Sequence, residues 1–214
     1  MNFTLKGLYF IADRSLSKKS VIEDVKAAVN AGVRIVQYRE KNLDDDAMTA
    51  EAKQIAGICK GKALFIVNDR VKVALASNAD GVHIGPYDMD FIDVRKILGS
   101  KKIIGVTVSS LEDAKRFEDF GADYISLSPV FSTSTKKDAG EPIGLDVVRQ
   151  ASKSLRVPFT VIGGINFGNL GDVVEAGAES VCMMSAILKA EDVGEEIRKA
   201  ERIIHEHAAR KGKK

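Results

Sequence analysis

The chain has 214 residues, of which 45% are hydrophobic and 29% are charged, a balance typical of one globular domain with one core. Its 32 basic and 30 acidic side chains give a formal net charge of +2, so no field of either sign favours nucleic acid or a membrane surface. We expect a single domain over residues 1–214, ending in a basic tail that is frayed from about residue 208.

The termini and the cysteines set further expectations. The first residues lack the cationic segment and apolar core of a signal peptide, and no apolar stretch is long enough to cross a membrane. We therefore expect a cytoplasmic protein, and a homo-oligomer is compatible with its composition. Cys59 and Cys182 lie among apolar residues, which predicts two small buried side chains rather than a disulfide or a metal pair.

Short runs rich in β-branched residues recur along the chain. They predict strands at residues 8–11, 33–37, 63–67, 81–84, 103–106, 124–127, 159–162 and 180–183. Most are apolar at consecutive positions, which is typical of parallel strands covered on both faces. Helical spacing of apolar residues predicts helices between them, at residues 21–29, 48–56, 71–77, 89–98, 110–120, 145–154, 166–176 and 191–207.

The alternation of strands and helices predicts the fold class. Gly32, Gly121 and Gly177 each end a predicted helix just before a strand, as a repeated unit requires. Eight such units fit a (β/α)8 barrel. The alternative is a doubly wound open sheet, but its first turn carries a glycine fingerprint, which residues 12–15 lack.

Polar residues follow the second predicted strand. Gln37, Arg39 and Lys41 alternate, so they project to one side while the chain stays extended. Two cations and an amide at this spacing form a clamp for a diphosphate, which accepts several charge-assisted hydrogen bonds. The alternative is a solvated loop in which Glu40 serves as the ion-pair partner.

The third and fourth predicted strands each end near an aspartate. If the two strands are neighbours, Asp69 and Asp88 lie at one edge of the sheet, where their mutual repulsion favours a divalent cation such as Mg²⁺. Asn68 can donate to a substrate ring or phosphate. The alternative is that these residues only cap the helices that follow them. His83 lies among apolar neighbours and is predicted to be a structural, hydrogen-bonded histidine.

The segment from 128 to 144 is long for a compact domain, which is more typical of a functional loop than of a passive one. Thr133, Thr135 and Lys136 can close over a phosphate-bearing ligand, although a flexible lysine loop is the alternative. The Gly163-Gly164 turn follows the seventh predicted strand, and Ser185 lies where the eighth ends. Backbone amides of a Gly-Gly turn and of a helix N-terminus suit a phosphate, which many barrels bind at this place.

Five segments, in this order, resemble the thiamine-phosphate synthase family: residues 37–41, 67–70, 80–85, 133–136 and 163–165. The resemblance covers roughly residues 8–188. It implies a (β/α)8 barrel and a transferase. The family joins 4-amino-2-methyl-5-hydroxymethylpyrimidine diphosphate to 4-methyl-5-(2-phosphooxyethyl)thiazole and releases diphosphate with Mg²⁺.

The resemblance also assigns residues. It gives Mg²⁺ to Asp69 and Asp88, and the pyrimidine diphosphate to Gln37, Arg39, Lys41, Asn68 and Thr107. It gives the thiazole phosphate and the diphosphate to Thr133, Thr135 and Lys136, and the thiazole phosphate to Gly164 and Ser185. Arg39, Lys41 and Lys136 are the predicted catalytic groups, because they would stabilise the departing diphosphate. Thr107 stands where the family commonly has serine, Pro86 where it has glutamine, and Tyr38 where it has leucine.

The implied mechanism is dissociative. The diphosphate leaves first, and the thiazole nitrogen then captures the pyrimidine-methyl cation, so no side-chain nucleophile is needed. One alternative is a thiazole tautomerase-like paralogue, which requires a general acid or base, and His83 is a poor candidate from its position. The other alternative is a non-catalytic barrel that binds a phosphate ligand.

Overall fold

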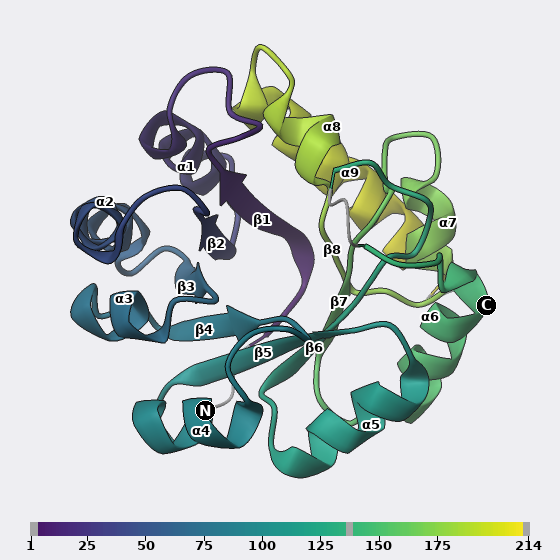
Figure 1. Cartoon of the computed structure of the whole chain (residues 1–214). Coiled ribbons are helices and arrows are strands. Elements are labelled where there is room, and N and C mark those ends of the chain that lie inside the picture. The colour runs from purple at the N-terminus through teal and green to yellow at the C-terminus, as the bar shows by residue number, and fades with distance from the viewer. Residues whose placement is uncertain (1–3, 136–138, 212–214) are drawn as a thin grey trace.

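The computed structural model describes residues 4–135 and 139–211, in which the strands form a closed parallel barrel surrounded by helices (Figure 1). Each strand pairs in parallel with the next one in sequence, and the pairing of β8 with β1 closes the ring. The predicted (β/α)8 barrel is confirmed, and the open doubly wound sheet is excluded because such a sheet has two unpaired edges.

The element bounds follow the predicted pattern closely. In the described residues the strands are β1 (Gly7–Asp13), β2 (Ile35–Arg39), β3 (Leu64–Asn68), β4 (Gly81–Ile84), β5 (Ile103–Val108), β6 (Tyr124–Leu127), β7 (Phe159–Val161) and β8 (Ser180–Val181). The helices there are α1 (Val21–Asn30), α2 (Asp45–Cys59), α3 (Val71–Ala76), α4 (Phe91–Leu98), α5 (Leu111–Phe120), α6 (Gly144–Ser154), α7 (Leu170–Glu175), α8 (Met184–Leu188) and α9 (Val193–Lys211). Helix α8 was not among the predicted helices, because five residues are too few to display a helical period.

Local capping explains where several helices begin. The side chains of Ser20, Asp44 and Ser110 accept hydrogen bonds from backbone amides in the first turns of α1, α2 and α5. These bonds satisfy amides that have no partner inside the helix. Gly121 then ends α5 in the left-handed conformation, with φ of 91°, as the glycine pattern predicts.

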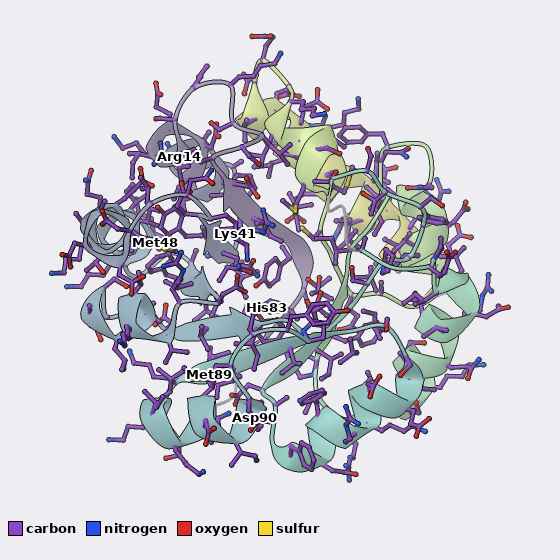
Figure 2. The ribbon with its side chains drawn as sticks, in the orientation of Figure 1. Arg14, Lys41, Met48, His83, Met89 and Asp90 are labelled. Atoms are coloured by element: carbon purple, nitrogen blue, oxygen red, sulfur yellow. The ribbon has the colours of Figure 1, made fainter. Side chains whose placement is uncertain are left out.

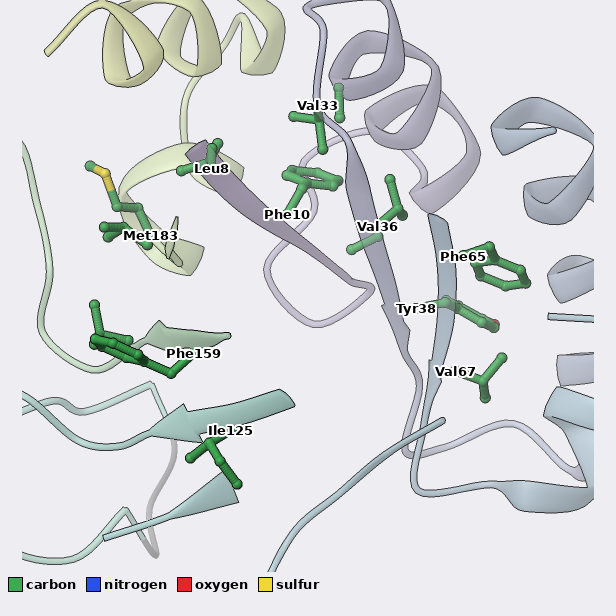
Figure 3. Packing of buried hydrophobic residues seen from close by; sticks show 14 of the residues in the cluster. Leu8, Phe10, Val33, Val36, Tyr38, Phe65, Val67, Ile125, Phe159 and Met183 are labelled. Atoms are coloured by element: carbon green, nitrogen blue, oxygen red, sulfur yellow. The ribbon is translucent and has the colours of Figure 1, made fainter. Parts of the chain in front are cut away.

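Each strand divides its side chains between two layers. Phe10, Val36 and Phe65 point outward and pack in the core between the barrel and the helices (Figure 3). The alternate positions point inward, so Tyr9 and Ile35 pack inside the barrel. Because both layers need apolar side chains, the strands are apolar at consecutive positions. Toward their carboxyl ends the inward positions become polar, and there the barrel opens into a pocket.

The remaining expectations concern the ends and the cysteines. Cys59 and Cys182 are free and buried, as predicted. Helix α9 continues to Lys211, so it extends into the segment for which we expect fraying. Among the helices of the described residues, none combines the length and the apolar character that a bilayer crossing requires.

Candidate active site at the carboxyl ends of the strands

One pocket at the carboxyl ends of the strands collects the predicted site residues. Figure 2 shows Lys41 and His83 pointing toward the middle of the strand ring, whereas Met48 lies outside it on α2. The predicted residues that line the pocket are Gln37, Arg39, Lys41, Asn68, Asp69, Asp88, Thr107, Thr133, Thr135, Gly164 and Ser185. Lys136 lies outside the described residues. Residues that were selected from separate segments of sequence therefore share one cavity.

The cationic group after β2 is held by carboxylates. Arg39 pairs with Asp13 at the end of β1, and Lys41 pairs with Asp69 after β3. The side chain of Asp13 is only 3% exposed, so its charge holds the guanidinium at the wall of the pocket. Lys41 is half exposed, so its ammonium can exchange Asp69 for a ligand phosphate.

Glu40 faces away from this group, which contradicts the alternative of a solvated loop. Its carboxylate is buried, accepts a hydrogen bond from Arg14 Nε at 2.6 Å, and accepts another from the backbone amide of Asn42 at 2.7 Å. The hydrogen bonds from Asn42 and Arg14 outweigh the effect of burial and lower the pKa of Glu40. Glu40 therefore fixes the turn after β2, while Arg39 and Lys41 stay available at the pocket.

Asp69 and Asp88 lie together at the ends of β3 and β4. Asp69 has φ of 59°, and its amide donates to the carbonyl of His83 at 2.8 Å, which ties the two strand ends together. Asp88 accepts from the amide of Gly85 at 2.7 Å. Neither aspartate caps a helix. Asp90 caps α4, and α3 begins without a side-chain cap, so the capping alternative is wrong for both residues.

The two carboxylates perturb each other. Burial, a hydrogen bond with Asp69 and the charge of Asp69 together raise the pKa of Asp88 to about 6. Burial also opposes ionisation of Asp69, but hydrogen bonds from Asp88 and Lys41 outweigh it and hold the pKa of Asp69 below its ordinary value. Near pH 6 an ionised Asp69 and a partly protonated Asp88 therefore share the site, which is the behaviour of two acids in contact.

This arrangement fits Mg²⁺. The ion is commonly bound by one or two carboxylates, with water and substrate phosphate completing its coordination. In residues 4–135 and 139–211, no group of three or more His, Cys, Asp or Glu side chains is placed to hold a metal ion. Two carboxylates beside a cationic clamp suit a metal that arrives with a phosphate-bearing ligand.

The opposite wall of the pocket is built from the turn after β7. Gly163 and Gly164 have φ of 108° and 63°, and a Cβ at Gly164 would lie 2.5 Å from the carbonyl oxygen of Ser132. The amide of Phe131 donates to the carbonyl of Gly163 at 3.0 Å, so the loop after β6 packs against this turn. The glycines are required for that close approach, and they also leave the backbone open to a phosphate.

The inner floor contains residues that the sequence did not indicate. Tyr9, Asp13, Ser126, Thr160 and Cys182 are buried and point inward, and all but Asp13 line the pocket. The two-residue period of β1 places Tyr9, Ile11 and Asp13 on one face, so the position of Asp13 at a strand end was a usable signal. His83 also points inward, and it is hydrogen-bonded as predicted.

Comparisons with known proteins agree with the family resemblance seen in the sequence. The family model described as thiamine monophosphate synthase matches residues 8–187. A Methanosarcina barkeri protein named thiamine-phosphate synthase is 48% identical over 188 residues, which cover 88% of this chain and 86% of that protein. Its counterpart from Methanosarcina mazei is 46% identical and covers 96% of this chain and 86% of its own length.

A solved structure described as thiamine phosphate pyrophosphorylase from Pyrococcus furiosus superposes with a TM-score of 0.85 at 36% identity. The superposition covers 94% of this chain and 96% of that one. The likeness therefore extends over nearly the full length of both chains.

Proposed function

The chain belongs to the thiamine monophosphate synthase family, and we propose that its pocket joins a pyrimidine diphosphate to a thiazole phosphate with the help of Mg²⁺. The protein is a transferase enzyme that catalyses the thiamine-phosphate synthase reaction. The observation that supports the residue roles is the contact between Asp69 and Asp88 beside the cations of β2.

The proposed roles are those that the family resemblance implies, and the shared pocket of the described residues supports them. Gln37, Asn68 and Thr107 hold the pyrimidine ring and its diphosphate near the centre of the barrel. Arg39 and Lys41 hold the diphosphate from one wall, and Lys136 is proposed to join them from the loop after β6. The remaining residues, Thr133, Thr135, Gly164 and Ser185, hold the thiazole phosphate.

The proposed reaction requires stabilisation of the negative charge on the leaving diphosphate, and it does not require a side-chain nucleophile. The bond between the pyrimidine methylene carbon and the diphosphate oxygen breaks, and a bond from the thiazole nitrogen to that carbon forms. Asp69 and Asp88 would hold Mg²⁺, which supplies positive charge to the diphosphate. Arg39 and Lys41 add charge-assisted hydrogen bonds where negative charge accumulates on the leaving oxygens. The remaining rate acceleration comes from positioning, because the bound thiazole nitrogen is held in line with the methylene carbon.

The contacts of His83 argue against the tautomerase alternative. Nδ1 lies 2.9 Å from the hydroxyl of Tyr124, and Nε2 lies 2.7 Å from the hydroxyl of Thr107. Both ring nitrogens are thus engaged with protein groups, which disfavours a direct proton transfer to a ligand. A barrel that only binds phosphate would have no need of the paired aspartates.

The test combines the purified protein with both substrates and Mg²⁺ and measures diphosphate and thiamine phosphate. We expect both products in equal amounts, and neither when one substrate or the metal is omitted. Isomerisation of thiazole phosphate alone would support the tautomerase instead, and binding without turnover would support the binding protein. The cytoplasmic location and the homo-oligomer stay predictions.

A further inference from the structure

Five polar side chains form a continuous chain of hydrogen bonds across the floor of the pocket. Gln37 Nε2 donates to the hydroxyl of Tyr9 at 2.9 Å, which lies 2.7 Å from the hydroxyl of Tyr124. Tyr124 lies 2.9 Å from His83 Nδ1, and His83 Nε2 lies 2.7 Å from Thr107 Oγ1. We call these five residues the floor chain. It joins β2, β1, β6, β4 and β5, and its two ends are predicted substrate contacts.

The floor chain is built into the barrel. Tyr9 and Tyr124 are buried, and their rings pack with centroids 5.9 Å apart. The ring of Tyr124 lies over Gly105 so closely that a Cβ there would come within 1.9 Å of Tyr124 Cζ. A glycine at this point of β5 therefore reserves the space for that ring. The proposed reaction does not use Tyr9, Tyr124 or His83 directly, so their arrangement requires another explanation.

Donors and acceptors indicate a direction along the floor chain. Burial raises the pKa of both phenols well above the ordinary value, so each keeps its proton. Tyr9 accepts a hydrogen bond from Gln37, so its own O–H can donate to Tyr124, and the O–H of Tyr124 can in turn donate to His83 Nδ1. With Nδ1 as an acceptor, the ring N–H of His83 lies on Nε2 and donates to Thr107. In this arrangement every hydroxyl donates once.

The two ends of the floor chain then present different hydrogen-bonding groups to the pocket, an acceptor at Gln37 and a donor at Thr107. One N–H of Gln37 is used by Tyr9, which fixes the orientation of the amide and leaves its oxygen as an acceptor, beside the second N–H, for a ligand. The oxygen of Thr107 accepts from His83, so its hydroxyl proton is directed to a ligand as a donor. An aminopyrimidine matches this pair, because its amino group donates and its ring nitrogen accepts.

We propose that Tyr9, Tyr124 and His83 are positioning residues that make the pocket specific for an aminopyrimidine by orienting Gln37 and Thr107. This inference rests on the proposed function. A 4-oxo analogue presents the reverse pattern, an acceptor and a ring N–H donor. It would leave buried polar groups unpaired in the pocket, and such mismatches discriminate strongly.

Tyr124→Phe tests the proposal, because it keeps the ring over Gly105 and removes the central hydroxyl. We expect the KM for the pyrimidine diphosphate to rise about tenfold, in line with the loss of a buried hydrogen-bond partner. The KM for thiazole phosphate should stay within about twofold, because the floor chain does not reach that wall. The preference for the 4-amino substrate over its 4-oxo analogue, measured as competitive inhibition, should fall about tenfold.

Tyr38→Phe is the matched control. It also removes one buried tyrosine hydroxyl, which donates to Glu51 on the helix-facing side of β2. We expect this variant to lose stability without losing the preference for the amino substrate. Equal effects of the two variants on that preference would overturn the proposal.

A pair of substitutions at His83 gives a second measurement. His83→Gln retains one acceptor and one donor, so it can still link Tyr124 to Thr107, whereas His83→Leu can do neither. We expect the glutamine variant to keep most of the preference and the leucine variant to lose it. Identical behaviour of the two folded variants would overturn the proposal. An inactive wild-type protein would instead overturn the proposed function.

Discussion

Asp88 is held in a position that disfavours its charged form. Its pKa in the folded protein is about 6, compared with 3.8 for the free side chain, and the chief cause is burial, followed by the hydrogen bond with Asp69. Since the folded state binds the proton more tightly, stability is gained as the pH falls from 6 to 4 and is lost as it rises through that window. Two ionised carboxylates at Asp69 and Asp88 therefore favour the folded state only when a cation offsets their negative charge.

Asp88→Asn is therefore expected to raise the melting temperature at pH 7 without metal and to abolish most of the turnover. Most of the gain should disappear by pH 4, where the folded-state carboxyl is protonated and the unfolded-state carboxyl, with its pKa of 3.8, is beginning to be protonated. Mg²⁺ should raise the melting temperature of the wild type and not that of the variant. Thermal unfolding at both pH values checks this, with the exposed Asp146→Asn as the control. A metal-induced shift in the variant would contradict the assignment of Asp88.

Arg39 is expected to be irreplaceable by lysine. Its guanidinium can bind Asp13 and a diphosphate at once, whereas one ammonium group cannot keep both partners in the same geometry. Arg39→Lys should lower kcat/KM for the pyrimidine diphosphate by roughly 10- to 100-fold, the range expected for a lost charge-assisted hydrogen bond. Arg149→Lys, in an exposed pair on α6, should leave the kinetics unchanged. Equal kinetics for Arg39→Lys and the wild type would show that a positive charge at this position, without the guanidinium geometry, is sufficient to hold the diphosphate.

At the scale of elements, the turn after β7 and the loop after β6 support each other. Gly164→Ala would place a methyl group 2.5 Å from the carbonyl oxygen of Ser132, so the loop must move away. We expect the KM for thiazole phosphate to rise about tenfold or more, because a displacement near the reacting groups weakens positioning. Steady-state kinetics with each substrate varied in turn measures this.

Gly99 offers a matched control for that substitution. It has φ of 69°, close to the 63° of Gly164, but a Cβ at Gly99 would meet nothing within 4 Å. Gly99→Ala therefore carries the backbone cost of a positive φ, on the order of 1–3 kcal/mol, without the clash. If both variants showed the same change in KM, the effect of Gly164→Ala would come from backbone strain and not from the packing of the loop.

At the scale of the whole molecule, the barrel closes through a short seam between β1 and β8. Gly7 and Leu8 are the residues of β1 that pair there, with Ser180 and Val181. Glu201 of α9 reinforces the seam, since its carboxylate accepts from the amide of Leu8 at 2.8 Å. The last helix therefore holds the first strand in place.

Glu201→Ala should lower the free energy of unfolding by about 1–3 kcal/mol, because the amide of Leu8 loses its acceptor. Urea unfolding measures this, and Glu206→Ala, on the exposed side of α9, serves as the control. Turnover at low temperature should persist, since Glu201 is not among the residues that line the pocket. An unchanged midpoint would show that the contact does not stabilise the closure.

The local pattern of the sequence determined the barrel and the location of its site. Strand period and helix spacing are local properties, so the eight repeated units were visible in the chain without any knowledge of contacts. The ends of the strands could be predicted from the same local pattern, and in a barrel the carboxyl ends of all strands lie on one face. Gln37, Asp69 and Thr133 could therefore be placed together, although their roles stay predictions.

Only the tertiary structure decided how the side chains are paired. Tyr9 and Tyr124 are 115 positions apart, and their contact depends on the barrel closing in one register. Asp90, rather than Asp88, caps α4, a choice that depends on where the backbone turns after β4. Sequence spacing determines which face a residue occupies, but hydrogen bonds depend on the positions and rotamers of distant segments, which only the folded packing fixes.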